Sequence, residues 1–149
     1  MPSESLTNLI WEMYCDGASR GNPGLASLGV IVYEESGNPI IKHGNFLGVM
    51  TNNEAEYNAL MKGLILSLDH FKKMNPNQTG LALNIYMDSE LVVKQVKGEY
   101  KVKNERLKRL HAEIKNILTG FTKYTIQHVP REKNKEADSL ANRALDERN

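Results

Sequence analysis

Cysteine is almost missing from this sequence of 149 residues, since Cys15 is the only one. A single cysteine excludes an intrachain disulfide and a zinc site built from thiolates. Long apolar runs are also missing, so no segment has the length of a membrane span. Residues 1–8 are polar and lack the basic and apolar regions of a secretory signal. We therefore expect a cytoplasmic, globular protein without a membrane partner.

Net charge is low as well, at +1, and by itself it indicates nothing about partners. The charge is unevenly distributed, however, because residues 94–135 hold 12 Lys or Arg against 4 Asp or Glu. Residues 1–93 carry an excess of acids. A basic middle beside acidic flanks is typical of a phosphate-binding face next to a carboxylate-rich site. It fits a solvated helix surface equally well, so charge alone leaves both interpretations open.

The first third of the chain predicts three strands. Residues 9–16 alternate between apolar and polar positions, residues 28–33 are rich in β-branched side chains, and residues 40–49 follow a tight turn. The Gly, Asn and Pro residues of 17–24 indicate a turn between the first two strands. Because the connections are short, we expect an antiparallel meander.

Helices alternate with strands in the remainder. Thr51 and Glu54 fit a capping box at the start of a helix, and a core-facing stripe follows, formed by Leu60, Leu64, Leu68 and Phe71. The pattern then predicts a strand over 81–88, helices over 89–97 and 104–118, and a fifth strand over 121–129. A last helix follows, and Asn134 is its predicted N-cap. The expected fold is α/β: one domain over 1–149, with a mixed five-stranded sheet of three antiparallel and then two parallel strands, flanked by helices.

Two aspartates are placed at the ends of predicted strands. Asp16 and Asp88 occur in the matching contexts Tyr-Cys-Asp and Tyr-Met-Asp. If the two strands are parallel neighbours, both carboxylates emerge at one edge of the sheet, where ligand sites of open sheets gather. For either residue taken alone, a structural role in the turn after its strand is the better explanation.

Two further acids lie on helices. Glu56 precedes Leu60 by four residues, so it lies on the core-facing stripe, where a charge is costly unless it is compensated. Asp138 lies at the margin of an apolar stripe in the first turns of the last helix, a position that a helix N-terminus also favours for an acid. Four such carboxylates together suit Mg²⁺ or Mn²⁺, which bind oxygen ligands and promote phosphodiester hydrolysis.

The motifs around these acids resemble the ribonuclease H type 1 family, over roughly residues 11–145. The resemblance is carried by four stretches in order: Asp16-Gly17-Ala18-Ser19-Arg20-Gly21-Asn22-Pro23-Gly24, Thr51-Asn52-Asn53-Glu54-Ala55-Glu56, Asp88-Ser89, and Asn134 with Ala137-Asp138. It implies an endonuclease that hydrolyses the RNA strand of RNA–DNA hybrids and leaves 5′-phosphate and 3′-hydroxyl ends. It also implies two Mg²⁺ ions, with Mn²⁺ as a substitute, held by Asp16, Glu56, Asp88 and Asp138.

Substrate-binding residues are also implied by the resemblance, on the minor groove side where 2′-hydroxyls distinguish RNA from DNA. The residues implied to meet this groove lie near Gly17, Asn22, Asn52 and Asn53. Ala18 and Thr51 complete the implied set, and Thr51 would contribute to selection of the DNA strand. Helix capping and turn formation explain the three asparagines without any ligand, so the family match alone favours binding. We expect the protein to be a monomer, because no apolar stripe is left for a partner.

The chain departs from the family pattern in three places. The basic handle that follows the third acid in many relatives is absent or reduced to a few residues here. Lys101 and Lys103 in this segment fit a contact with a DNA backbone and fit a solvated turn about equally well. His128 falls in the last predicted strand, so Arg131 replaces the family's catalytic histidine in our interpretation. Val49 stands where relatives often have an arginine that assists a DNA phosphate, which leaves double-stranded RNA open as a further substrate.

Three rival interpretations remain. A catalytically silent hybrid-binding module would lack one or more of the acids, and all four are present. A DNA-cutting nuclease of integrase or resolvase type would share the acid on the central strand but not the complete first and second motifs. A structural protein without a nucleic-acid role leaves the core-facing Glu56 unexplained.

Overall fold

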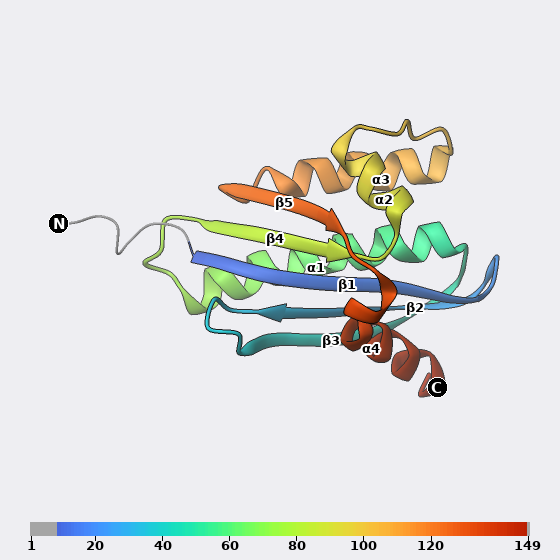
Figure 1. Cartoon of the computed structure of the whole chain (residues 1–149), viewed down its shortest axis with the longest axis horizontal. Helices are drawn as coiled ribbons and strands as arrows, with labels where there is room; N and C mark the ends of the chain where they lie inside the picture. Colours follow the sequence, from blue (N-terminus) through green and yellow to red (C-terminus); the bar gives the residue numbers. More distant parts are fainter. Residues whose placement is uncertain (1–8, 149) are drawn as a thin grey trace.

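The computed structural model describes residues 9–148, which form a five-stranded sheet with helices on both faces (Figure 1). The polar segment 1–8, on which the expectation about a secretory signal rests, lies outside the described residues. The strand order is β3-β2-β1-β4-β5. The predicted mixed sheet is confirmed, with β1 to β3 antiparallel and β1, β4 and β5 parallel. Within the described residues, no helix has the length and apolar character needed to cross a membrane.

The meander consists of β1 (Leu9–Gly21), β2 (Gly24–Tyr33) and β3 (Pro39–Met50). All three strands are longer than the sequence predicts. Residues 17–21 do not form a turn, because they pair with Gly24–Leu28 of β2 and continue β1 beyond Asp16. The turn is confined to Asn22 and Pro23. Asp16 therefore lies within a strand rather than at its end.

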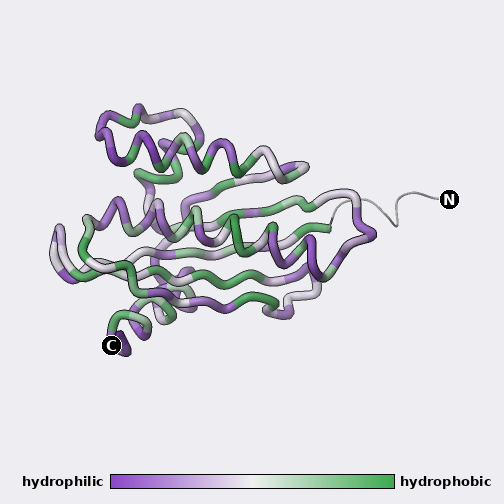
Figure 2. Tube along the Cα trace, turned by 180° about the vertical axis from the view of Figure 1, so that it is seen from behind, coloured by the Kyte–Doolittle hydropathy of each residue, from purple (hydrophilic) through white to green (hydrophobic). Residues whose placement is uncertain are grey.

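The first helix, α1 (Asn52–Met74), begins as predicted. The Thr51 hydroxyl accepts the Glu54 amide, and the Glu54 carboxylate accepts the Thr51 amide, so that the capping box is complete. On the same face of the sheet as α1, the side chains of β1 and β4 form the core, including Trp11, Met13, Cys15, Leu83 and Ile85. Seen from behind, the sheet shows long apolar stretches under α1 (Figure 2).

The second half contains β4 (Leu81–Met87), α2 (Glu90–Lys97), α3 (Glu105–Leu118), β5 (Lys123–His128), a short 3₁₀ helix η2 (Arg131–Lys133) and α4 (Lys135–Asp146). Ser89 and Asn104 cap α2 and α3 through their side chains, and Gly98 ends α2 with a positive φ of 84°. Asn134 stands before α4 but makes no capping hydrogen bond, contrary to the prediction. Its side-chain amide donates to the Cys15 carbonyl instead, at 3.0 Å.

The last helix, α4, covers the opposite face of the sheet from α1 (Figure 1). It packs closely on β2 at Gly29, where a Cβ would lie 2.1 Å from the Ala137 carbonyl oxygen, so only glycine allows this approach. Its buried residues are Ala137, Ala141 and Leu145. Leu140 and Ala144, the other two residues of the predicted apolar stripe, are half-buried. This packing brings the first turn of α4, with Asp138, to the side of β1 that carries Asp16.

Candidate active site

The two aspartates on the sheet are neighbours because β1 and β4 are parallel. Tyr14 of β1 pairs with Tyr86 of β4, so Asp16 and Asp88, each two residues further along, emerge at the same edge. This arrangement confirms the expectation drawn from the matching contexts. Asp16 is 5% exposed, and it lies on the α4 side of β1.

Glu56 is brought to the aspartates by a close approach of α1 to β1. A Cβ at Gly17 would lie 2.3 Å from the carbonyl carbon of Ala55, so only glycine allows the first turns of α1 to lie so near. The Gly17 amide donates to Glu56 Oε1 at 2.8 Å, which fixes the carboxylate beside Asp16. Carboxylate oxygens of Asp16, Glu56 and Asp88 all lie within 4.8 Å of one another.

Asp138 faces the same cluster from α4. The Asn142 side-chain amide donates to both the Asp138 backbone carbonyl and its carboxylate, at 2.9 and 3.1 Å, and so orients this acid. All four acids line one cavity of about 370 Å³. None of them forms a salt bridge with Lys or Arg among residues 9–148.

Burial and the crowding of carboxylates raise the pKa of two members of this cluster, Asp16 and Glu56. Burial and the neighbouring carboxylates Glu56, Asp88 and Asp138 raise the pKa of Asp16 far above its ordinary value. Burial, followed by the charge of Asp88, also raises the pKa of Glu56, although the Gly17 amide acts in the opposite direction. Carboxylates that repel one another in a buried site are stabilised by a bound cation, so the cluster fits a divalent metal.

The remaining lining of the cavity contains several of the predicted site residues. Gly17, Ala18, Asn52 and Arg131 line it, and His128 is not among the lining residues. Arg131 is exposed on η2, whereas His128 is exposed at the end of β5. The structure thus brings Arg131 to the acids. Sequence reasoning missed three residues of this lining, namely Ser19, Arg20 and Asn142.

A second cavity of about 480 Å³ is lined by three other predicted substrate residues. Asn22, Thr51 and Asn53 line it together with Asn104 and Arg106 of the α3 N-terminus. Asn22 Oδ1 accepts the Asn52 amide at 3.0 Å, which joins the β1–β2 turn to the start of α1. Arg106 Nη1 lies 3.6 Å from Glu54 Oε2, and its side chain is 74% exposed. Lys101 and Lys103 are exposed in the α2–α3 connection and do not line either cavity.

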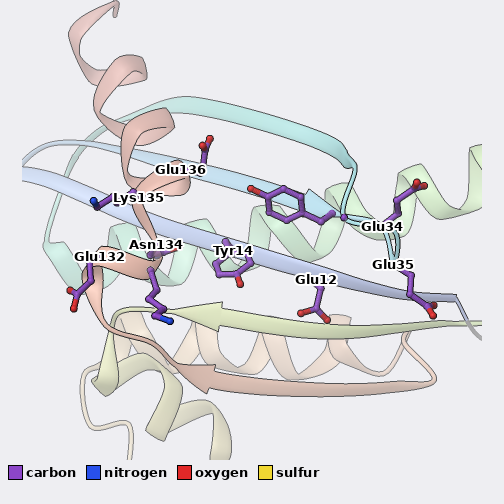
Figure 3. A pocket seen from close by; sticks show the side chains of 11 residues that line it. Glu12, Tyr14, Glu34, Glu35, Glu132, Asn134, Lys135 and Glu136 are labelled. Atoms are coloured by element: carbon purple, nitrogen blue, oxygen red, sulfur yellow. The ribbon is translucent and has the colours of Figure 1, made fainter.

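A third hollow, of about 430 Å³, lies on the α4 face of the sheet (Figure 3). Glu12 and Tyr14 of β1 line it with Tyr33, and the segment from Glu132 to Glu136 forms another side. Glu12 accepts hydrogen bonds from the Tyr86 hydroxyl and the Asn84 amide, both at 2.6 Å. This hollow is rich in acids, but the half-buried Glu12 carboxylate already has donors.

Comparison with known proteins agrees with the geometry. A family model described as reverse transcriptase-like matches residues 14–144. A ribonuclease HI from Halobacterium salinarum is 39% identical over 135 residues, which are 90% of this chain and 63% of that protein. A bifunctional protein of Mycobacterium tuberculosis is 37% identical over 88% of this chain, and the matched region spans 34% of that longer protein.

Solved structures show the same likeness. The crystal structure of RNase H1 from Halobacterium salinarum superposes with a TM-score of 0.84 at 38% identity, and covers 92% of this chain and 98% of that one. The structure of LC11-RNase H1 in complex with an RNA/DNA hybrid gives a TM-score of 0.80 at 39% identity, over 91% and 96% of the two chains. Fold, site geometry and sequence agree, and the chain belongs to the ribonuclease H type 1 family.

Proposed function

We propose that this chain is an endonuclease that hydrolyses the RNA strand of RNA–DNA hybrids with the help of divalent metal ions. The observation that carries the proposal is the convergence of Asp16, Glu56 and Asp88 within 4.8 Å, with Asp138 in the same cavity. A relative of 39% identity whose structure contains an RNA/DNA hybrid supports the choice of substrate.

The donor set fits hard cations. All four side chains offer oxygen only, and burial together with the neighbouring carboxylates raises the pKa of Asp16 and of Glu56, which opposes the ionisation of these two acids until positive charge is supplied. Asp16, Glu56, Asp88 and Asp138 would hold two Mg²⁺ ions, or Mn²⁺ in their place. Such ions supply Lewis-acid activation and charge neutralisation for hydrolysis of a phosphodiester, with 5′-phosphate and 3′-hydroxyl products.

The neighbouring groups of the chain have positioning tasks. The Gly17 amide holds Glu56, and the Asn142 amide holds Asp138, so that both carboxylates keep their direction toward Asp16. Arg131 is exposed at the cavity, so its guanidinium can reach the phosphate and stabilise charge that develops during bond breaking. We assign this role to Arg131 rather than to His128.

Substrate recognition divides between the two cavities. Asn22 and Asn52, joined by their hydrogen bond, lie between them and offer amide groups to 2′-hydroxyls in the minor groove. Thr51, Asn104 and Arg106 surround the second cavity with donors suited to a phosphate of the DNA strand. Arg106 would thus compensate for Val49, and Lys101 and Lys103 would add a weaker, salt-sensitive attraction.

The test is cleavage of one labelled sequence offered as RNA–DNA hybrid, RNA duplex, DNA duplex and single-stranded RNA. We expect the RNA strand of the hybrid to be cut with Mg²⁺ or Mn²⁺ and to stay intact in EDTA. Cutting of the RNA duplex as well would widen the substrate class without changing the mechanism. Cutting of the DNA duplex alone, or undiminished activity in EDTA, would refute the proposal.

A further inference from the structure

Arg20 lines the active-site cavity, yet the predicted set of substrate residues does not include it. Its Nη2 atom lies 2.5 Å from Oδ1 of Asp146, a residue 126 positions later in the chain. The two side chains are 48% and 61% exposed, so solvent reaches both partners. The ion pair therefore holds a guanidinium at the mouth of the cavity, accessible to a ligand.

The stability of α4 does not explain Asp146. It is the last residue of α4, where a negative charge opposes the helix dipole, and Glu147 follows directly. An exposed ion pair of this kind also contributes little net stability, because solvent screens it and both side chains lose freedom. The clear consequence of the pair is that the charge of Arg20 is neutralised while no substrate is bound.

The position of Arg20 on β1 suits a nucleic-acid backbone. Asp16, Ala18 and Arg20 alternate along the strand and point to the same side, and all three line the cavity. Four residues of strand advance about 13 Å. A nucleic-acid strand that presents one phosphate to Asp16 and follows β1 would therefore bring a further phosphate of the same backbone to the guanidinium. Guanidinium groups bind phosphate and carboxylate with the same bidentate geometry, so one can replace the other.

We propose that Arg20 binds a phosphate of the cleaved strand, and that Asp146 competes with this phosphate for the same guanidinium. Substrate binding exchanges the Asp146 carboxylate for the phosphate, and Asp146 thereby lowers the affinity for the hybrid. This inference rests on the proposed function, and it assigns opposite effects to two partners of one ion pair.

The experiment measures hybrid binding with Mg²⁺ at several salt concentrations, in an Asp88→Asn background that leaves the substrate uncut. Arg20→Ala should weaken binding about fivefold and reduce the slope of log affinity against log salt by about one, as expected for one lost phosphate contact. Asp146→Asn should tighten binding about twofold to threefold, because the competitor is removed. The double variant should bind like Arg20→Ala, because Asp146 acts only through Arg20.

Lys73→Ala is the matched control, since it removes a positive charge from the exposed last turn of α1, away from both cavities. It should change binding by less than the Arg20 variant and leave the salt slope unaltered. If Arg20→Ala and Asp146→Asn both weaken binding and both lower the melting temperature, the pair is a structural clasp and the inference is wrong. If the Asp88→Asn protein binds the hybrid and neither Arg20→Ala nor Asp146→Asn changes its affinity, Arg20 makes no phosphate contact and the inference is wrong. A parent that binds no hybrid at all would refute the proposed function as well.

Discussion

The sheet carries two acid-lined hollows on strand β1, and they differ in how their carboxylates are compensated. In the hollow of Figure 3, Glu12 accepts hydrogen bonds from Tyr86 and Asn84, and Tyr14 stacks on Tyr86 with ring centroids 4.7 Å apart. In the active-site cavity, Asp16 lies four residues further along the same side of β1, and its neighbours are three more carboxylates.

The comparison shows that acid content alone does not define a metal site. The half-buried Glu12 carboxylate accepts hydrogen bonds from two donors of the protein. The Asp16 cluster has the Gly17 and Asn142 amides as donors for two of its members, and its repulsion remains uncompensated by any salt bridge within residues 9–148. Only the second arrangement gains substantially from binding a cation, and the predictions below test this difference.

The largest difference should appear when one carboxylate is neutralised in each hollow. Asp16→Asn should reduce cleavage of the hybrid by about a thousandfold or more, because one of the four carboxylates that would hold the metal ions is lost. Glu12→Gln is the matched control, since it keeps the shape and the hydrogen-bond acceptor on the same face of β1. Turnover by the Glu12 variant should equal that of the wild type. Equal losses in both variants would mean that the two hollows do not differ in function.

Arg131 should have the next largest effect. Arg131→Ala should lower kcat about tenfold at saturating substrate and change KM little, because the guanidinium acts on charge developing at the phosphate. Arg131→Lys should restore part of kcat, because the ammonium group returns the positive charge without the planar, bidentate geometry of a guanidinium. Steady-state kinetics on the hybrid decide the point. An unchanged kcat in the Ala variant would return His128 to consideration.

The dependence of stability on pH should also separate the two hollows. The raised pKa values of Asp16 and Glu56 mean that, above about pH 4, the folded protein binds more protons than the unfolded chain. In EDTA, the free energy of unfolding should therefore fall by several kcal/mol as pH rises from 5 to 8. Urea denaturation at both pH values measures it. Asp16→Asn should remove much of this slope, Glu12→Gln should leave it intact, and a slope of opposite sign would contradict the assignment.

The smallest effect is expected at the second cavity. Arg106→Ala should weaken hybrid binding about threefold, because the exposed guanidinium at this cavity would lose the single phosphate contact proposed for it. Adding Val49→Arg to this variant should restore affinity, since relatives often carry an arginine at that position. Titration of a fluorescent hybrid at two salt concentrations checks both. A Val49→Arg variant that binds no better would show that the phosphate site is elsewhere.

Local sequence patterns were sufficient for much of the site. The stripe that contains Glu56, the capping box at Thr51 and the matching contexts of Asp16 and Asp88 are short-range signals. The structure confirms the capping box and brings the three acids together, although Asp16 lies within β1 rather than at its end. The family resemblance added the functional interpretation. It was needed because Asp138 taken alone is equally well explained by its place near a helix N-terminus.

Other features depend on packing between distant segments and have no local signal. Residues 17–21 contain turn-forming types, but pairing with β2 extends the strand through them. Asn134 has the sequence of a helix cap, and the approach of α4 to β1 gives its amide a different partner, the Cys15 carbonyl. Arg20 and Arg106 were missed because their surroundings are formed by α4 and α1, far away in the chain. A basic residue within a recognised motif, such as Arg20, was the one available hint.

The most direct test of the central claim is single-turnover cleavage of a labelled RNA–DNA hybrid as Mg²⁺ is increased, compared between the wild type and Asp88→Asn. We expect the wild type to cut only the RNA strand, with a rate that rises with Mg²⁺ until it saturates. The variant should bind the hybrid as well as the wild type and cut it at least about a thousandfold more slowly. Wild-type cleavage that is independent of Mg²⁺, or a variant that cuts at the wild-type rate, would contradict the account.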